Sequence, residues 1–221
     1  MKGKNKSKKS RMEKFFILIH LFEKYIFRLI FPYKKHGNLT KYNKGSLILV
    51  GNHYSLMDMA YACQVTDRPI HFVAKDSLWK GGIVKWFVDM VECIPVKRDG
   101  TDVQAIKACM KILKSGGVIN IYPEGTRNHS YRDLLPFHSG AAALSIKTQT
   151  PIIPVVQIKK MKLFRKRDII YGDPIEFREF YGKKTTRADI ENCDNRLREA
   201  IINMRQAFID KYKIKFKSYE V

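Results

Sequence analysis

A histidine and an aspartate five residues apart have the types and the spacing that suit proton-transfer chemistry. His53 follows a short apolar run, separated from it by Gly51 and Asn52, and Asp58 lies about one turn into a predicted helix. Imidazole has an ordinary pKa of ~6.5, and the positive end of a helix disfavours a second proton on the ring. A neutral His53 can therefore accept a proton. A carboxylate at Asp58 can bind the other ring nitrogen, select the tautomer and stabilise the imidazolium.

The same stretch also fits a purely structural motif. Ser55 and Asp58 have the spacing of a capping box, in which a hydroxyl and a carboxylate bind free amides of the first helical turn. Spacing alone leaves both interpretations open. Because Ser55 is better used as the cap and no cysteine lies within several residues, a catalytic His53 is expected to activate a substrate hydroxyl.

Strands and helices alternate around these residues. Apolar runs predict strands at 46–50, 70–75, 92–98, 118–122, 151–156 and 168–171, and helices at 56–65, 77–91, 102–115, from 139 onward and at 187–212. This order predicts an α/β fold with a mixed, largely parallel central sheet flanked by helices, whose active loops gather at strand ends. His53 then lies at a strand-to-helix junction, Lys75 lies at a strand end, and residues 123–128 form a loop.

Charge and cysteine usage narrow the functional classes. The 221 residues include 42 Lys and Arg but 21 Asp and Glu, a formal net charge of +21, which predicts an anionic partner: nucleic acid, an anionic membrane surface or a phosphorylated substrate. The four cysteines have no metal-type spacing and are expected to be free thiols, buried where their segments are apolar: Cys63, Cys93, Cys109 and Cys193. No zinc pattern, phosphate loop or carboxylate cluster indicates a metal or resident cofactor.

The N-terminal residues 1–40 are expected to form a basic tail and an amphipathic helical segment, followed by one catalytic domain at 41–221. The apolar stretch 15–31 is interrupted by charges before it reaches the ~20 residues that a spanning helix needs. With its basic flanks it better fits a helix lying in a membrane interface. A core helix is the alternative, and a secretory signal is discounted because no small-residue cleavage site follows.

A second basic cluster, at 159–167, has apolar residues interleaved with its lysines and arginines. A solvated hairpin and a second membrane-facing patch explain it equally well. The apolar stripe of the helix predicted at 187–212 is expected to cover the core.

Four separated motifs together resemble those of a known enzyme family. In chain order they are His53 with Asp58, Ile94-Pro95-Val96-Lys97-Arg98, Pro123-Glu124-Gly125-Thr126-Arg127 and Pro151-Ile152-Ile153-Pro154. Over about residues 45–175 the chain is similar to the 1-acylglycerol-3-phosphate acyltransferases, in their compact bacterial form. The resemblance implies transfer of a fatty acyl group from acyl-CoA or acyl-carrier protein to the sn-2 hydroxyl of lysophosphatidate, giving phosphatidate, without a metal or resident cofactor.

The resemblance also implies a role for individual residues. His53 would be the general base and Asp58 would orient it. The residues expected to bind the phosphate and glycerol of the acceptor are Arg98, Glu124, Gly125, Thr126 and Arg127. Lys75 is a candidate for the oxyanion or the phosphate, with backbone amides near Val96 or Gly51 as alternatives. A structural ion pair is the alternative use of either arginine.

The expected partners are an anionic phospholipid membrane, lysophosphatidate and acyl-CoA or acyl-carrier protein, with the enzyme peripheral on the cytoplasmic face and no nucleic acid bound. One rival is a related acyltransferase acting on glycerol-3-phosphate or another lysophospholipid. A rival of a different class is a basic nucleic-acid- or membrane-binding module without catalysis. That rival leaves His53, Asp58 and residues 123–127 without a purpose.

Overall fold

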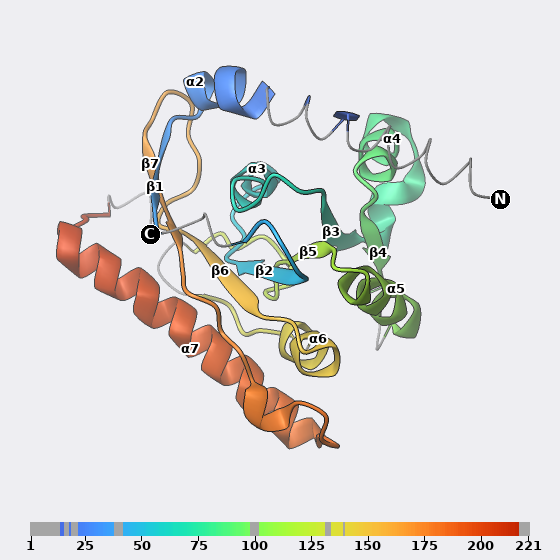
Figure 1. Ribbon diagram of the computed structural model, residues 1–221. Helices are drawn as coiled ribbons and strands as arrows, with labels where there is room; N and C mark the ends of the chain where they lie inside the picture. Colours follow the sequence, from blue (N-terminus) through green and yellow to red (C-terminus); the bar gives the residue numbers. More distant parts are fainter. Residues whose placement is uncertain are drawn as a thin grey trace.

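A seven-stranded sheet runs through the centre of the protein (Figure 1). The structure, a computed structural model, describes residues 14–15, 18, 22–37, 42–97, 102–130, 134–138 and 140–216. Its strands are β1 (Tyr33–His36), β2 (Leu47–Gly51), β3 (Ile70–Lys75), β4 (Ile94–Val96), β5 (Val118–Ile121), β6 (Ile152–Gln157) and β7 (Arg167–Tyr171). Its helical elements are η1 (Glu23–Phe27), α2 (Arg28–Ile30), α3 (Asp58–Ala62), η2 (Asp76–Lys80), α4 (Gly82–Met90), α5 (Val103–Lys114), α6 (Ala141–Thr148), η3 (Arg178–Phe180) and α7 (Arg187–Tyr212).

The strand order is β1-β7-β6-β2-β5-β3-β4. Strands β2 to β6 are parallel wherever they are neighbours, β7 is antiparallel to β6, and β1 is parallel to β7. The predicted mixed, largely parallel sheet is therefore confirmed. The carboxyl ends of β2 to β6 share one edge of the sheet, here called the carboxyl edge, and β1 begins at this edge because it runs in the opposite direction.

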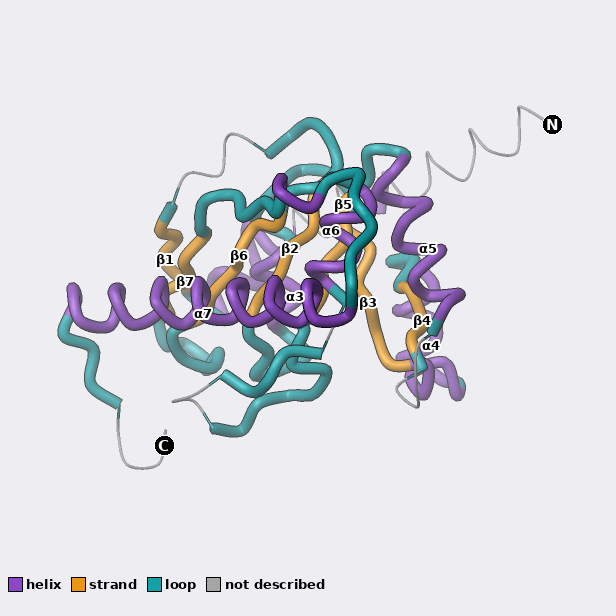
Figure 2. The backbone as a smooth tube through the Cα atoms, turned by 90° about the horizontal axis from the view of Figure 1, so that it is seen from below, coloured by secondary structure: helices purple, strands orange, loops and turns teal. Residues whose placement is uncertain are grey.

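Helices cover both faces of the sheet. Alternate residues of a strand point to opposite faces, so Ile48 and Val50 of β2 pack with α5, α6 and α7, whereas Leu47 and Leu49 pack with α3. Figure 2 shows α7 crossing the first of these faces. All residues of β2 and β6 are buried, which explains their largely apolar sequences.

Two predicted helices differ from the structure. The helix predicted at 77–91 is divided into the 3₁₀ turn η2 and α4, because Gly81 between them and Gly82 at the start of α4 adopt φ values of +129° and +72°. The helix predicted at 56–65 is only the short α3, followed by turns. By contrast, α7 has the predicted bounds, and Thr186 and Asp189 form a capping box at its start.

The N-terminal part adds a strand that the sequence did not predict. Strand β1 pairs with β7 at the edge of the sheet, although it precedes residue 41, where the catalytic domain was expected to start. Residues 1–13, which include most of the predicted basic tail, lie outside the described residues. Across the described part of the chain, no helix has both the length and the apolar character needed to cross a membrane. A membrane-binding role of this segment stays a prediction.

Candidate active site

His53 is held at the carboxyl edge in the middle of the sheet. It follows β2, which lies between β5 and β6. Strands β2 and β6 approach very closely here, because a Cβ atom on Gly51 would lie 2.3 Å from the carbonyl oxygen of Val155. Asn52 fastens the same strands, since its side chain donates to the Gln157 carbonyl and accepts from the Gln157 amide at 2.8 and 2.9 Å. The backbone that leads into His53 is therefore held firmly against β6.

Asp58 binds His53 and also closes the turn that links His53 to α3. Its Oδ2 lies 3.0 Å from His53 Nδ1 and also accepts the amides of Tyr54 and Ser55 at 2.6 and 2.7 Å. Its Oδ1 accepts the Ser55 hydroxyl. The carboxylate is only 1% exposed. Because this oxygen is an acceptor from two amides, the matching tautomer has the hydrogen on Nδ1 and leaves Nε2 free to accept a proton.

Tyr122, which directly follows β5, packs against the imidazole. The two ring centroids are 4.2 Å apart and the planes are 14° from parallel. Burial raises the pKa of Tyr122 well above its ordinary value, and the nearby Asp58 adds to this shift. A neutral phenol therefore supports one face of the His53 ring. Nothing in the spacing of the motifs indicated this contact.

Glu124 ties the loop after β5 to the backbone of His53. Its Oε1 accepts the His53 amide at 2.9 Å, and its Oε2 accepts the Asn128 side chain and the Leu135 amide at 2.8 and 3.0 Å. The Asn128 amide donates in turn to the His53 carbonyl at 2.6 Å. Burial raises the pKa of Glu124, and its hydrogen bonds from Leu135, His53 and Asn128 oppose the shift. Both carboxylate oxygens are thus engaged within the protein, and the predicted contact of Glu124 with a substrate stays a prediction.

The last two residues of the 123–127 motif are exposed, whereas Pro123 is buried and Gly125 is partly buried. Gly125 has a φ of +64°, and a Cβ there would lie 2.9 Å from the His138 ring, so glycine suits this turn. Thr126 and Arg127 are exposed. Among the residues that the structure describes, Arg127 has no ion-pair partner, which disfavours its alternative role in structure. Since Asn128 binds His53, Arg127 lies on the loop next to the histidine.

Of the remaining predicted site residues, Lys75 belongs to the described residues and Arg98 does not. Lys75 ends β3 at the carboxyl edge, is exposed, and pairs in register with Val96. Arg98 lies outside the described residues, two positions after the end of β4. The described ranges contain no group of three or more His, Cys, Asp or Glu side chains arranged to hold a metal ion.

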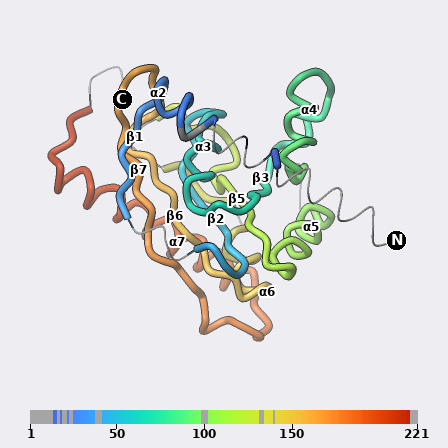
Figure 3. The backbone as a smooth tube through the Cα atoms, turned by 45° about the horizontal axis from the view of Figure 1, so that its top comes forward, coloured from blue at the N-terminus to red at the C-terminus, as the bar shows by residue number. Residues whose placement is uncertain are grey.

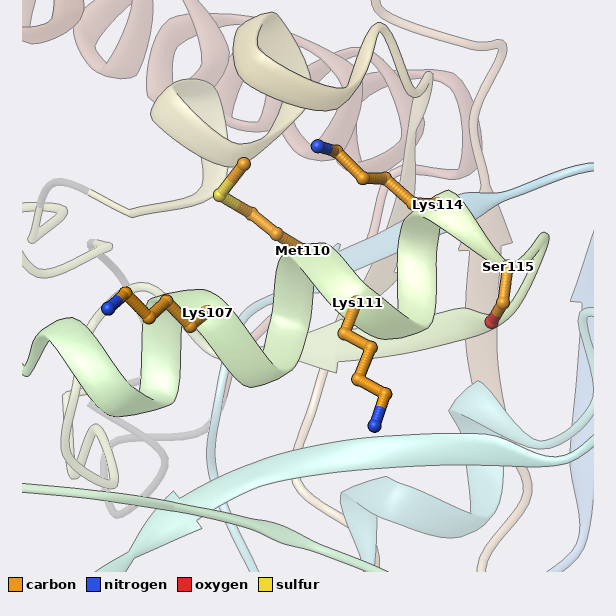
Figure 4. A pocket seen from close by; sticks show the side chains of 5 residues that line it. All are labelled: Lys107, Met110, Lys111, Lys114 and Ser115. Atoms are coloured by element: carbon orange, nitrogen blue, oxygen red, sulfur yellow. The ribbon is translucent and has the colours of Figure 1, made fainter.

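A separate hollow on α5 does not include these residues. It has a volume of about 510 Å³. Figure 4 shows its lining, which consists of Lys107, Met110, Lys111, Lys114 and Ser115. The chemistry of the candidate site is therefore not located there.

Comparison with known proteins identifies the family. Residues 33–158, more than half of the chain, match the family model described as Acyltransferase, and the chain belongs to this family. The resemblance inferred from the four motifs is thus confirmed.

Individual relatives have more specific names. The chain is 31% identical over 110 residues to the chloroplastic 1-acyl-sn-glycerol-3-phosphate acyltransferase BAT2 of Brassica napus, a match covering 49% of this chain but 31% of that protein. It is 25% identical over 178 residues to the 1-acyl-sn-glycerol-3-phosphate acyltransferase of Bacillus subtilis strain 168, covering 74% and 88%. The crystal structure of the 1-acyl-sn-glycerophosphate acyltransferase PlsC from Thermotoga maritima has the same fold, with a TM-score of 0.67, 19% identity and coverage of 99% of this chain and 86% of that one.

Proposed function

We propose that the protein transfers a fatty acyl group from an acyl thioester to the sn-2 hydroxyl of 1-acylglycerol-3-phosphate, forming phosphatidate. The observation that carries the proposal is the buried Asp58 carboxylate, which lies 3.0 Å from His53 Nδ1 at the carboxyl edge of the sheet in a member of the acyltransferase family. The names of the relatives supply the acceptor and the product class.

His53 acts as a general base in this reaction. Its free Nε2 removes the proton from the sn-2 hydroxyl while the oxygen attacks the thioester carbonyl carbon. The tetrahedral intermediate then expels the thiolate as the C–S bond breaks, and the proton on His53 passes to the leaving sulfur. Asp58 stabilises the imidazolium between the two steps. The protein forms no covalent bond to the acyl group.

The exposed end of the 123–127 motif binds the acceptor. The guanidinium of Arg127 matches the phosphate oxygens of lysophosphatidate, and Thr126 adds a hydroxyl donor beside it. Arg98, two residues after β4 in the sequence, serves the same phosphate. Lys75, at the neighbouring strand end, supplies positive charge for the oxyanion or the phosphate.

The acyl donor is acyl-CoA or acyl-carrier protein, and the reaction uses neither a metal nor a resident cofactor. The site works at the cytoplasmic face of an anionic phospholipid membrane, where the acceptor and the product reside. The net charge of +21 supports an anionic surface as the partner.

The test is an acyltransferase assay on purified protein with lysophosphatidate, glycerol-3-phosphate and other lysophospholipids as acceptors, and with both donor types. Phosphatidate formation that is lost in His53→Ala is the expected result. Turnover of His53→Ala at the wild-type rate overturns the mechanism, and a preference for another acceptor overturns the substrate assignment.

Arg127→Ala is expected to raise the acceptor KM and lower kcat in the same assay, because Arg127 binds the phosphate and thereby orients the attacking hydroxyl.

A further inference from the structure

Exposed apolar side chains are gathered at the carboxyl edge, around the candidate active site. Apart from Leu18, Val103 and Tyr212, every large apolar side chain that is exposed in the described residues belongs to one of four segments. These segments are residues 22–30 with η1 and α2, the turn just before α3, helix α4, and the loop between β6 and β7. Such clustering marks an interaction surface rather than ordinary scatter.

The sheet topology places all four segments at this edge. Helix α3 follows β2, α4 follows β3, and the β6–β7 loop follows β6, whereas α2 leads into β1, which begins there. The amide of Phe164 donates to the carbonyl of Ile30 at 2.7 Å, so the β6–β7 loop touches the end of α2. Figures 1 and 3 both show α2 and α4 on opposite sides of α3. The two apolar helices therefore flank the strand end that carries His53.

Helix α4 is the most exposed of these segments. Ile83, Val84, Trp86 and Phe87 have the i, i+1, i+3, i+4 spacing of one helix face, and Ile83 and Trp86 are 84% and 62% exposed. Only Val88 of this helix is buried. Exposing this face to water has a free-energy cost of about 25 cal/mol per Å² of apolar surface. A partner that covers the face removes this cost.

We propose that α4 is a membrane-inserting wedge, which together with the apolar surface of α2 seats the carboxyl edge on an anionic phospholipid bilayer. The inference deepens the proposed function and rests on it, because docking is useful when the acceptor is a lipid. The lipid acceptor then reaches His53 from the bilayer, between the two helices. The sequence predicted membrane contact for the N-terminal helix and left residues 159–167 open between a solvated hairpin and a membrane-facing patch. Helix α4 is a new contact element.

Charge and shape favour a bilayer over a protein partner. Exposed basic residues accompany the apolar ones, with Lys80 before α4 and Lys160, Lys162 and Arg165 around the exposed Leu163 and Phe164. Basic side chains beside apolar ones match anionic head groups above acyl chains. The four apolar segments are separate elements that share only an edge. A bilayer accommodates such a discontinuous set, whereas a protein interface needs one closely packed patch.

Tryptophan fluorescence measures insertion directly. The two tryptophans differ in position: Trp86 lies on the apolar face, whereas the Trp79 indole donates to Asp89 at 2.8 Å. Trp79→Phe leaves Trp86 as the reporter, and Trp86→Phe leaves Trp79. With vesicles of phosphatidylglycerol and phosphatidylcholine that carry brominated acyl chains, Trp86 is expected to be quenched at least about twofold more strongly than Trp79. Equal or absent quenching in vesicle-bound protein overturns the proposal.

A charge-matched pair of variants tests the energetic contribution. Ile83→Asp is expected to lower partitioning into these vesicles by about tenfold or more, because an aspartate replaces an aliphatic side chain that enters the acyl layer. Tyr212→Asp makes the same charge change on α7, beside His36 at the far end of β1, and is expected to bind nearly as the wild type does. Equal losses in the two variants overturn the wedge. A circular dichroism melt verifies that both remain folded.

Two further measurements separate the outcomes. Sedimentation equilibrium without lipid is expected to show that the wild type is a monomer. If the wild type self-associates and Ile83→Asp does not, the exposed face of α4 is a contact between two copies and the proposal is overturned. Ile83→Asp is expected to lose activity on long-chain lysophosphatidate in vesicles but to retain it on a short-chain, water-soluble lysophosphatidate. If the wild type is inactive on both substrates, the proposed function fails while the quenching result still decides the membrane contact.

Discussion

At the scale of single residues, Asp58 combines two roles that the sequence left as alternatives. Its carboxylate caps the turn through the Tyr54 and Ser55 amides and binds His53 at the same time. A carboxylate fixed by backbone amides is a rigid partner for an imidazole. The reciprocal capping box is not formed, because the Ser55 hydroxyl accepts the Met57 amide and the Asp58 amide donates to the Ser55 carbonyl. The contacts of the carboxylate with the turn before α3 nevertheless support the orientation that catalysis needs.

Substitutions at Asp58 and Ser55 separate these roles. Asp58→Asn is expected to lower kcat on the order of a thousandfold, because an amide no longer selects the Nδ1–H tautomer or stabilises the imidazolium. Ser55→Ala removes only the hydroxyl contacts and is expected to cost about 1 kcal/mol of stability with kcat changed only slightly. Steady-state kinetics and thermal melts measure both effects. Equal losses of kcat in the two variants would mean that Asp58 acts only through the cap.

Glu124 is expected to position His53, and kinetics distinguish this from substrate binding. Glu124→Gln keeps an acceptor for the His53 amide but presents an NH₂ group to the Asn128 and Leu135 donors. We expect kcat to fall by about tenfold or more with the acceptor KM nearly unchanged. A rise in acceptor KM at constant kcat would instead support the predicted contact with the glycerol.

The pH dependence of stability gives an independent view of Glu124. Burial raises its folded-state pKa above the ordinary value of 4.5, so the folded chain holds this proton more tightly than the unfolded chain. The stability contributed by the group is therefore present below about pH 4.5 and is lost as the pH rises through the folded pKa. The Tm of the wild type minus that of Glu124→Gln is expected to decrease with pH over this window. A difference that increases with pH contradicts the assignment.

The cysteines are expected to be chemically inert in the folded protein. All four are free and buried, as the sequence predicted for those in apolar segments. Burial raises the pKa of Cys93 and Cys109 to about 12, so roughly one part in ten thousand of either thiol is ionised at about pH 8. Ellman's reagent should label the native protein slowly and label all four thiols at once in denaturant. Rapid labelling of the native protein would show that these segments open readily.

At the scale of elements, local signals were predictive and long-range contacts were not. Helix α7 was predicted from its apolar spacing, and the strands β2 and β5 from short, mainly apolar runs. Strand β1 was missed because two of its four residues are lysines and its hydrogen bonds depend on β7, distant in the sequence. Tyr122 and Asn128 were missed for the same reason, since both reach His53 only through the pairing of β2 with β5.

The close approach of β2 and β6 makes Gly51 a critical position. In Gly51→Ala the new methyl group meets the Val155 carbonyl at 2.3 Å, so the strands have to separate at the entry to His53. Overpacking of this kind costs about 1–3 kcal/mol, which for a chain of this length corresponds to roughly 2–4 °C in Tm per kcal/mol. Gly140→Ala is the matched control, because its nearest neighbour would be 4.0 Å away. Thermal melts that do not distinguish the variants would contradict this packing argument.

At the scale of the whole molecule, the site, the apolar segments and the basic charge favour one orientation on a lipid surface. The carboxyl edge carries His53, the outward-facing Arg127 and the exposed face of α4, whereas α7 crosses a face of the sheet that is packed and needs no partner (Figure 2). An enzyme that docks by this edge keeps its acceptor close to the bilayer throughout the reaction. The proposed function and the proposed wedge thus require the same orientation.

Salt separates the contributions of charge and apolar surface to this docking. The net charge of +21 attracts the protein to anionic vesicles, and this attraction weakens as the Debye length falls from ~10 Å at about 0.1 M salt to ~3 Å at about 1 M. Apolar insertion of α4 does not weaken in this way. Vesicle sedimentation should therefore show binding that decreases with salt to a plateau, and the plateau should be lost in Ile83→Asp but retained in Tyr212→Asp. Binding to RNA should disappear entirely at high salt, because counterion release is its main driving force. If lipid binding also vanishes, charge alone holds the protein on the membrane and α4 does not insert.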